Sequence, residues 1–383
     1  MIIHHDSTFG GLYTGENVEQ ETQTYLNRLR NYNEGQYYHS EKIKYNPSAV
    51  PDGYNIDMKS EAFQKLNAKI RKEINEYWTE EFRRCTQGYL GMCGLQYGYR
   101  TYCKLRGGKG PMQYRRFDNW YFKLLEERIW GDKIGDGIIE IGRRRSGKSS
   151  KLMWFVCQLL RIMSDIDVIV TSKTEEDAKR VLISEKLQFI YQHLPTPLKP
   201  TILSTSMSTF HLGKREKDES DNTIITGRNS KVVAKSPKPE ALEGGTLWAW
   251  ICDEIGKIAN LYDLYSLTNP ALFDANGLKR EGLVILTGVA GDMEKFSDVL
   301  TLWKSAKEEQ LTRIFSPGWT SLFIDEFGEE DVEAAVKFIL SKRHEVIKNK
   351  TLSASKRETR LVDLQQQFPL TVDEAFLSKS RGK

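Results

Sequence analysis

The residues from Gly142 to Ser149 read G-R-R-R-S-G-K-S and match the phosphate-binding pattern G-x-x-x-x-G-K-[ST] at every fixed position. The backbone N–H groups of such a loop surround a β-phosphate, and the helix that follows offers its positive N-terminus to the same charge. In this pattern the lysine reaches the β- and γ-phosphates and the serine ligates Mg²⁺. The sequence therefore predicts ATP and Mg²⁺ as cofactors, bound by Gly142, Arg143, Arg144, Arg145, Ser146, Gly147, Lys148, Ser149 and Ser150.

A second set of reactive side chains follows an apolar run later in the chain. The run Leu247–Glu254 has the form of a Walker B element, since its apolar residues end in two acids. Asp253 would hold Mg²⁺, and Glu254 would orient or deprotonate the attacking water. An Asp-Glu pair at a strand end is also a common surface feature, but together with the complete loop it indicates a hydrolytic site. Thr287, near the end of the apolar run Leu283–Gly288, is a candidate sensor of the γ-phosphate.

The segments around these residues alternate between strand and helix patterns. An apolar strand, Gly137–Ile141, precedes the loop, and apolar residues at helical spacing follow it in Ser150–Met163. A strand at Asp167–Thr171 and a capping box at Thr174, opening a helix to about His193, continue the pattern. Such alternation predicts an α/β fold, with a mainly parallel sheet covered by helices on both faces and ligands at the carboxyl ends of the strands.

The pattern changes between residues 209 and 236, where three short β-like segments predict a small antiparallel insertion with a projecting hairpin. The segments are Thr209–Leu212, Thr223–Thr226 and Lys231–Ala234. The charged stretch Lys214–Asp221 between the first two is expected to be a solvated turn, with a contact to DNA or to a neighbouring subunit as the alternative.

Composition limits the class of protein. The 383 residues are 39% hydrophobic and 28% charged, which is typical of a globular chain. The N-terminus lacks the order of a signal peptide and no apolar run is long enough to cross a bilayer, so we expect an intracellular protein with no membrane partner. Five cysteines form no CxxC pair and predict no disulfides. Zinc bound by Cys85, Cys93 and Cys103 is an alternative, although their spacing is unusual for a structural site. The net charge of +4 is compatible with a polyanionic partner but does not require one.

The order of these motifs resembles the ATPase domain of the large terminase subunit of tailed bacteriophages, over residues 85–377. The segments that carry the likeness are the arginine-rich loop Gly142–Ser149, Thr171–Thr174 with Ala178, Ala241–Gly245, Ile251–Glu254, Thr287–Gly288 and the tail Gln367–Leu377. The tail is similar to the family's segment between the ATPase and its nuclease, and few unrelated P-loop proteins end in this way.

The resemblance implies an additional-strand P-loop NTPase, RecA/terminase-like, in which ATP hydrolysis drives double-stranded DNA into a procapsid. It also implies a portal protein, a small terminase subunit and a homo-oligomeric, pentameric ring as partners, and the host cell cytoplasm rather than the mature virion as the location. Arg144 stands three residues before Gly147 and matches the family's arginine that neutralises transition-state charge. Within the triplet Arg143–Arg145 the assignment is open by one residue, and all three could instead face solvent or bind DNA.

The chain divides into an N-terminal extension (1–84), the ATPase core (85–320) and a C-terminal helical subdomain (321–383) towards an absent nuclease domain. Nuclease activity is not expected in this chain, because the acids Asp325–Asp331 are better explained as the solvated start of a helix at Glu329–Lys348. No adenine-recognition motif is evident, and Gln113, Tyr114 and Phe117 are only candidates.

Two other classes of function remain open. One is a helicase-like ATPase that remodels nucleic acid, against which stands the absence of recognisable helicase arginine motifs. The other is a non-catalytic ATP-binding assembly protein, which has no use for a base beside the γ-phosphate. Glu254 separates this second class from a motor.

Overall fold

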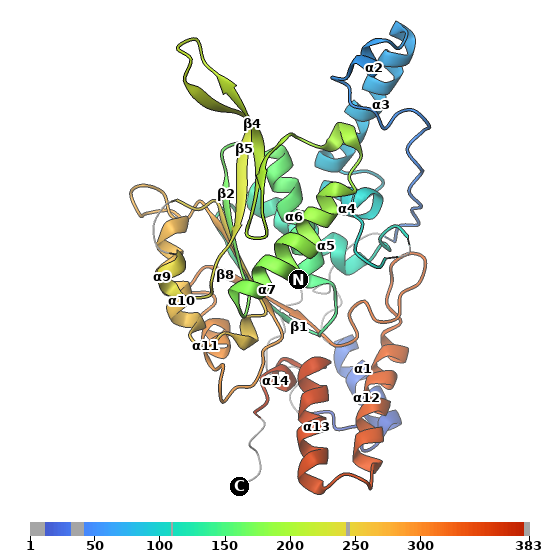
Figure 1. Ribbon diagram of the computed structural model, residues 1–383. Helices are drawn as coiled ribbons and strands as arrows, with labels where there is room; N and C mark the ends of the chain where they lie inside the picture. Colours follow the sequence, from blue (N-terminus) through green and yellow to red (C-terminus); the bar gives the residue numbers. More distant parts are fainter. Residues whose placement is uncertain (1–11, 32–41, 109, 243–245, 379–383) are drawn as a thin grey trace.

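The computed structural model describes residues 12–31, 42–108, 110–242 and 246–378. Within these residues one eight-stranded sheet runs through the body in the order β3-β4-β5-β2-β6-β7-β1-β8 (Figure 1). The strands are β1 Gly137–Gly142, β2 Asp167–Thr171, β3 Ile202–Thr205, β4 Thr209–Lys217, β5 Thr223–Ala234, β6 Ala249–Asp253, β7 Leu283–Gly288 and β8 Leu311–Ser316.

The central strands confirm the predicted fold class. Parallel pairing joins β5 to β2, β2 to β6, β6 to β7, β7 to β1 and β1 to β8. Strand β7 therefore lies between β1, which leads to the predicted phosphate-binding loop, and β6, which leads to Asp253 and Glu254. This is the additional-strand arrangement. The carboxyl ends of β1, β6 and β7 meet at one edge of the sheet, where ligands of such folds bind.

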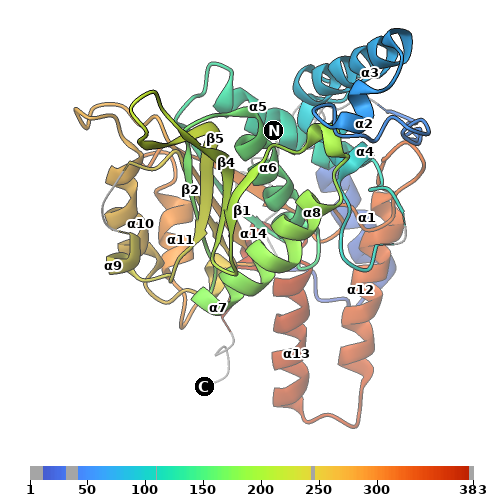
Figure 2. The ribbon, with the colours of Figure 1, turned by 45° about the horizontal axis from the view of Figure 1, so that its top comes forward.

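Helices cover both faces of the sheet, as predicted (Figure 2). Neighbouring residues of one strand face opposite sides: Ile138 packs with the first helical layer and Ile139 with the second. The first layer contains α2 Glu61–Gln64, α3 Ala68–Gln87, α4 Gly94–Tyr102, α5 Arg116–Ile129, α6 Lys148–Ile162 and α8 Phe189–Gln192. The second contains α9 Pro239–Leu242, α10 Leu261–Thr268, α11 Asp298–Lys304 and α14 Val372–Ala375.

The helix predicted after Thr174 is present, with an unexpected winding. The Thr174 hydroxyl accepts a hydrogen bond from the backbone N–H of Asp177, which confirms the cap. The segment then runs through α7 Glu175–Asp177, the π-helical stretch η2 Ala178–Gln188 and α8. Short 3₁₀ turns occur at η3 Thr196–Leu198, η4 Ile255–Lys257 and η5 Asn269–Leu272.

The antiparallel segment and its hairpin are also confirmed. Strands β3, β4 and β5 pair antiparallel, and the β4–β5 hairpin projects from the body (Figure 1). The predicted segments Thr223–Thr226 and Lys231–Ala234 form one continuous strand. Because β5 also pairs with β2, the segment extends the central sheet.

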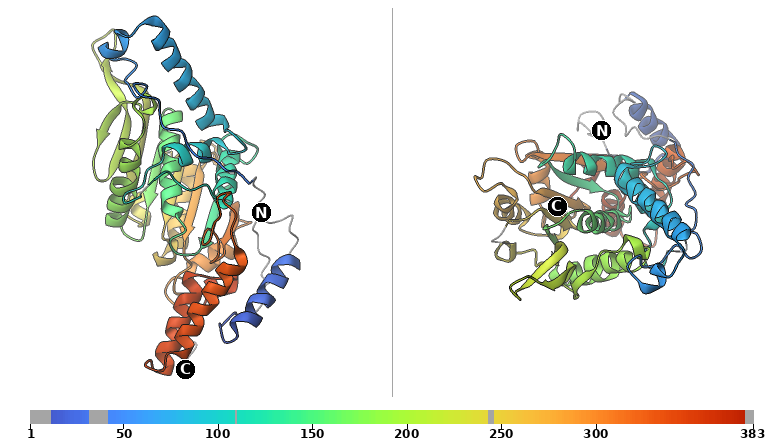
Figure 3. Two further views of the ribbon diagram at one scale, coloured as in Figure 1. Left: turned by 90° about the vertical axis from the view of Figure 1, so that its right-hand side faces the viewer. Right: turned by 90° about the horizontal axis from the view of Figure 1, so that it is seen from above.

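The N-terminal helix packs against the C-terminal helices. Helix α1 Val18–Asn31 lies beside α12 Val332–Lys348 and shares an apolar cluster with it (Figure 3). The predicted helix Glu329–Lys348 thus begins at Val332, with the carboxylate of Asp331 capping the N–H of Ala334. Helix α13 Ala354–Gln367 follows it back towards the sheet. The predicted domain boundaries stay predictions, since residues 1–84 contribute both to this cluster and, through α3, to the first helical layer.

Candidate nucleotide site

The loop between β1 and α6 has the backbone shape that its glycines allow. Gly147, which caps the N-terminus of α6, has a φ of 87°, in the left-handed region where glycine carries no steric penalty. Arg145 also lies in that region, with a φ of 62°. A non-glycine residue there costs about 1–2 kcal/mol, and such strain is concentrated at functional loops. The loop is therefore held open at the N-terminus of a buried helix.

A cavity of about 290 Å³ lies against this loop. Of the predicted binding residues, Arg144, Arg145, Ser146, Gly147, Lys148, Ser149 and Ser150 line it, together with Asp253 and Glu254. Lys186, Gly288 and Val289 complete the lining and were not predicted. Gly142, the side chain of Arg143 and Thr287 do not reach it. The structure thus brings residues that follow β1 and β6, as predicted, to the same cavity as residues at the end of β7.

Lys148 has its ammonium folded back onto the loop. Its Nζ donates to the carbonyls of Arg143 at 2.6 Å and Gly142 at 3.3 Å, and to the hydroxyl of Ser146 at 3.3 Å. Burial lowers the pKa of Lys148, because the charged form loses its hydration there. A phosphate group in the cavity would supply the negative charge that this buried ammonium lacks.

Ser149 and Asp253 lie together in the position predicted for a metal site. The Ser149 hydroxyl donates a hydrogen bond of 2.6 Å to Oδ2 of Asp253. Burial raises the pKa of the Asp253 carboxyl, with the Ser149 hydrogen bond opposing the rise. Hydroxyl and carboxylate oxygens are the ligands that Mg²⁺ prefers, so both residues fit this cation. Bound there beside a nucleotide, Mg²⁺ would neutralise charge on the phosphate oxygens.

Glu254 follows Asp253 at the mouth of the cavity in a strained backbone conformation. Its φ is 56°, and its N–H donates a hydrogen bond of 2.9 Å to Oδ1 of Asp253. The Glu254 carboxylate is 3.0 Å from the ammonium of Lys257 and 3.8 Å from that of Lys173. Two cations therefore hold a half-exposed carboxylate beside the cavity, where it could accept a proton from water.

The three arginines of the loop lie in different environments. Arg143 is buried and donates to the carbonyl of Ser321 at 3.1 Å, and its burial lowers the pKa of the guanidinium to about 10. Arg144 and Arg145 are exposed and line the cavity. The backbone N–H of Arg144 donates to the carbonyl of Gln367 at 3.0 Å. The structure thus separates Arg143 from the two arginines that can reach a phosphate.

Thr287 points into the sheet. It is fully buried and donates a hydrogen bond of 3.0 Å to the carboxylate of Glu140, its partner in the β1–β7 register. Ser316 of β8 donates to the other oxygen of Glu140 at 3.2 Å. The carboxylate therefore bridges three strands beneath the loop. The role of Thr287 as a γ-phosphate sensor stays a prediction. Because Thr287 does not line the cavity, a γ-phosphate would have to act on it through the adjoining Gly288 and Val289, which do.

A further residue near the loop was missed in the sequence. Arg115, the residue before α5, donates to the carbonyl of Ser146 at 3.4 Å. No motif pointed to it, since the contact depends on how α5 packs. Of the adenine candidates, Tyr114 and Phe117 are buried, and Gln113 donates to the carbonyl of Asp325 at 3.5 Å. None of these three lines the cavity.

The alternative metal sites receive no support from the described residues. All five cysteines are buried and free, and the described part of the chain has no group of three or more His, Cys, Asp or Glu that could hold a metal ion. The acids Asp325–Asp331 form caps and surface ion pairs, including Glu326 with Lys44.

Residues 243–245 of the segment Ala241–Gly245 lie outside the described residues. None of the helices described has the length and apolarity that a membrane span needs.

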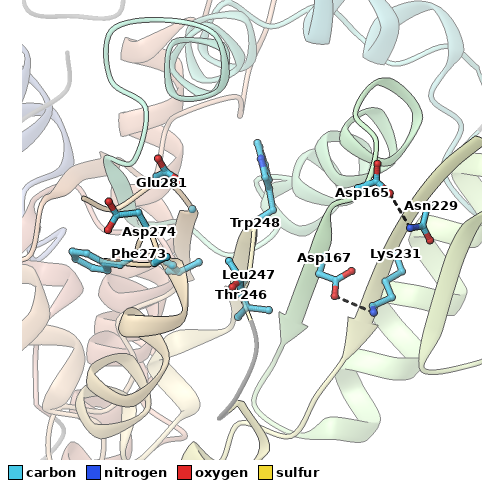
Figure 4. Close-up of a pocket in the computed structure, with 13 residues that line it drawn as sticks. Asp165, Asp167, Asn229, Lys231, Thr246, Leu247, Trp248, Phe273, Asp274 and Glu281 are labelled. Carbon is cyan, nitrogen blue, oxygen red and sulfur yellow. Dashed lines mark hydrogen bonds and ion pairs between the residues drawn. The ribbon is translucent and has the colours of Figure 1, made fainter. Parts of the chain in front are cut away.

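A larger hollow, of about 680 Å³, lies at the opposite edge of the sheet (Figure 4). It is lined by residues at the amino ends of β2, β6 and β7, among them Trp248 and Glu281. Asp167 is paired with Lys231 at 2.9 Å, and Asp165 accepts from Asn229 at 2.8 Å. None of the described residues that line this hollow belongs to an α-helix, whereas the smaller cavity lies at the N-terminus of α6 and is the better nucleotide site.

Comparison with known proteins gave structural similarities alone. No family model matches the chain, and no curated protein matches it. The chain is similar to the large terminase of HK97 bacteriophage, with a TM-score of 0.47 and 13% identity over 72% of this chain and 54% of that one. It is similar to the large terminase ATPase domain of Thermus phage P74-26, with a TM-score of 0.38 and 14% identity over 62% of this chain and 89% of that one.

A third similar structure is the large terminase of the thermophilic bacteriophage D6E in complex with ADP. The TM-score is 0.39 and the identity 14%, over 65% of this chain and 52% of that one. The match therefore spans about half the length of the HK97 and D6E proteins. The three solved structures named here are large terminases of phages or the ATPase domain of one.

Proposed function

We propose that this chain is the ATP-hydrolysing motor of viral DNA packaging and translocates double-stranded DNA into a procapsid. The observation that carries the proposal is the convergence of Ser149, Asp253 and Glu254 at one cavity beneath the N-terminus of α6. The motifs Ala241–Gly245 and Gln367–Leu377, which resemble those of large terminases, support DNA packaging over other uses of the same chemistry.

Each residue of the site has a role in this proposal. Lys148 and the loop N–H groups bind the β- and γ-phosphates, and Ser149 and Asp253 hold Mg²⁺. Glu254 orients and deprotonates the attacking water, while Arg144 stabilises the charge that develops on the γ-phosphate. The half-exposed position of Glu254, next to the cavity but paired with lysines, suits a base that must exchange a proton with solvent.

The partners belong to the proposal as well. A packaging motor would work as a homo-oligomeric ring, pentameric by resemblance, on a portal protein, with a small terminase subunit delivering the DNA in the host cell cytoplasm. Contacts to phosphates would dominate its affinity for DNA, which would therefore fall with salt and depend little on sequence.

The test compares the native chain with Glu254→Gln in steady-state ATP hydrolysis, with and without linear double-stranded DNA. We expect the variant to lose at least about 10²-fold in turnover, the range for a general base, while still binding ATP. Native turnover should change when DNA is added. Glu308→Gln serves as a matched control, because Glu308 is an exposed glutamate remote from the cavity and should leave turnover unchanged.

The alternatives give different results in the same assay. A non-catalytic assembly protein would bind ATP tightly with equal, negligible turnover in the native chain and in Glu254→Gln. A helicase-like remodeller would be stimulated by single-stranded ends or forks more than by intact duplex. Turnover by the Glu254→Gln variant at the native rate would contradict the assigned mechanism.

A further inference from the structure

The turn that joins α12 to α13 carries a cluster of positive charge. Residues 348–360 contain five basic residues and one acidic residue, a formal charge of +4. The whole chain also carries +4, so the remaining residues are neutral in sum. The segment is therefore strongly basic for its length, although the chain as a whole is close to neutral.

Four of the five cations of this segment are exposed and unpaired within the described part of the chain. Lys348, Lys350, Lys356 and Arg360 are all exposed, and none makes an ion pair or a side-chain hydrogen bond with a described residue. By contrast, several exposed lysines elsewhere have an acidic partner, as Lys342 has in Glu345. Clustered like charges without counterions repel one another, and an added polyanion would relieve that repulsion.

The fifth basic residue, Arg357, shapes the turn. Its guanidinium donates to the carbonyls of Leu352 at 2.8 Å and Asn349 at 3.3 Å. Ser353 caps the N-terminus of α13 by accepting from the N–H of Lys356. Two separate interactions therefore fix the backbone that presents the cations, and the positive end of the α13 dipole points in the same direction.

The position of the segment makes it accessible to a large partner. Helices α12 and α13 extend away from the sheet and end in this turn, opposite the β4–β5 hairpin (Figures 1 and 3). No large apolar residue among positions 348–360 is exposed, unlike the apolar centre of a typical protein interface. Exposed cations without an apolar centre favour the phosphate backbone of a nucleic acid over an acidic protein.

The same helix reaches the nucleotide site at its other end. Gln367, the last residue of α13, accepts a hydrogen bond from the N–H of Arg144 in the loop. The side chain of Gln366 donates to the carbonyl of Gly291, after β7, at 2.9 Å. A helix of 14 residues is about 20 Å long, so one rigid element separates the cations from the loop.

We propose that Lys348, Lys350, Lys356 and Arg360 form a surface, the basic turn, that binds the phosphate backbone of double-stranded DNA without reading its sequence. The inference rests on the proposed function for the identity of the polyanion. It adds the place where DNA is held, and it connects that place to the phosphate-binding loop through α13.

The test measures binding of a short fluorescent duplex to the full chain by anisotropy, between about 50 and 200 mM salt. The turn variant carries K348Q, K350Q, K356Q and R360Q. A control variant with K69Q, K279Q, K304Q and K307Q removes the same charge from exposed lysines elsewhere that have no ion pair within the described residues. Each phosphate contact contributes about 0.9 to the slope of log K against log salt, so the turn variant should lose up to about 3.6 of that slope.

The control variant should keep most of the native slope. A variant with K348R, K350R and K356R should keep it too, because arginine preserves the charge. Hydrolysis of ATP without DNA should match the native rate in the turn variant, whereas the effect of DNA on that rate should disappear. Equal slopes for the turn variant and the native chain would overturn the inference. They would also do so if the basic turn instead binds an acidic protein, because the DNA contacts would then lie elsewhere. Failure of the native chain itself to bind DNA, or to respond to it in hydrolysis, would instead overturn the proposed function.

Discussion

The Ser149 hydroxyl and the Asp253 carboxylate are joined by a hydrogen bond of 2.6 Å, although 104 residues separate them in the chain. The contact crosses from the first turn of α6 to the end of β6, past the intervening strand β7. It places two oxygen atoms of the kind that Mg²⁺ prefers side by side. Folding therefore includes the free-energy cost of burying the Asp253 carboxyl, because the rest of the chain holds it in this position.

Asp253→Asn tests this cost through pH. Because burial raises the folded-state pKa of Asp253, ionisation weakens the native chain relative to the variant as pH rises through that pKa. The difference in unfolding free energy should be constant below the usual carboxyl pKa of 3.8. At neutral pH the variant should resist urea better than the native chain, yet it should no longer be stabilised by ATP in a magnesium-dependent manner.

Asp132→Asn provides the control for this experiment, since Asp132 is an exposed acid that does not line the cavity. Urea unfolding from acid to neutral pH measures all three proteins. A native chain that gains stability over Asp253→Asn as pH rises would show that the carboxylate is stabilised by its surroundings in the absence of a cation, contrary to this account.

The parts of the site that are local in the chain could be predicted from the sequence. The loop Gly142–Ser149 and the acids after β6 follow contiguous apolar strands, and a short-range pattern identifies both. The run Leu283–Gly288 was predictable as a strand from its apolar residues, but the place of β7 between β6 and β1 followed only from the resemblance. Neither kind of reasoning indicated that Arg115 would touch the loop, because that contact depends on the packing of α5 against α6.

Contacts between distant segments account for most of what was missed. Helix α1 packs against α12, with an ion pair between Glu19 and Lys337, although the sequence alone indicates an N-terminal extension. Thr287 lies at a strand end, as expected, but the register of β1 and β7 turns its hydroxyl towards Glu140. The side of a strand that a residue faces depends on its neighbours in the sheet, and no local pattern specifies them.

The arginine triplet should divide by function. Arg144→Gln should lower turnover by about 10³-fold or more, the range for an arginine that stabilises the phosphoryl transition state, with unfolding unchanged. Arg143→Gln should instead lower the free energy of unfolding by about 1–3 kcal/mol, since it leaves the buried carbonyl of Ser321 without its donor. Single-turnover hydrolysis and urea unfolding on the same preparations separate the two effects. If Arg145→Gln shows the larger loss of turnover, the transition-state role belongs to Arg145.

Gly256→Ala should impair turnover without abolishing ATP binding. A Cβ at Gly256 would lie 2.0 Å from the carbonyl oxygen of Val289 and 2.4 Å from that of Ala290, so the backbone after Glu254 must shift. A displacement of about 1 Å at a catalytic group can cost about 10²-fold in rate. Gly110→Ala is the matched control, because a Cβ there meets nothing within 4 Å. Native turnover in Gly256→Ala would show that the position of Glu254 does not depend on this close approach.

The ion pair between Arg343 and Glu374 should be essential to the attachment of the C-terminal helices. Both side chains are fully buried, and the Glu374 oxygens accept from Arg343 at 2.7 Å twice and from the N–H groups of Tyr13 and Leu370. Glu374→Gln leaves a buried guanidinium without its counterion, which costs about 3–5 kcal/mol. Lys342→Met, which breaks an exposed pair on the same helix, should cost about 1 kcal/mol or less.

A double variant, Arg343→Met with Glu374→Gln, distinguishes the pair from the packing around it. Because the uncompensated charge is gone, the double variant should be more stable than Glu374→Gln alone, and the two single losses should exceed the combined loss by more than about 1 kcal/mol. Urea unfolding measures the whole cycle. Additive losses would mean that the carboxylate acts through the N–H groups of Tyr13 and Leu370, and that the N-terminal segment, rather than α12, fixes the tail beside the nucleotide site.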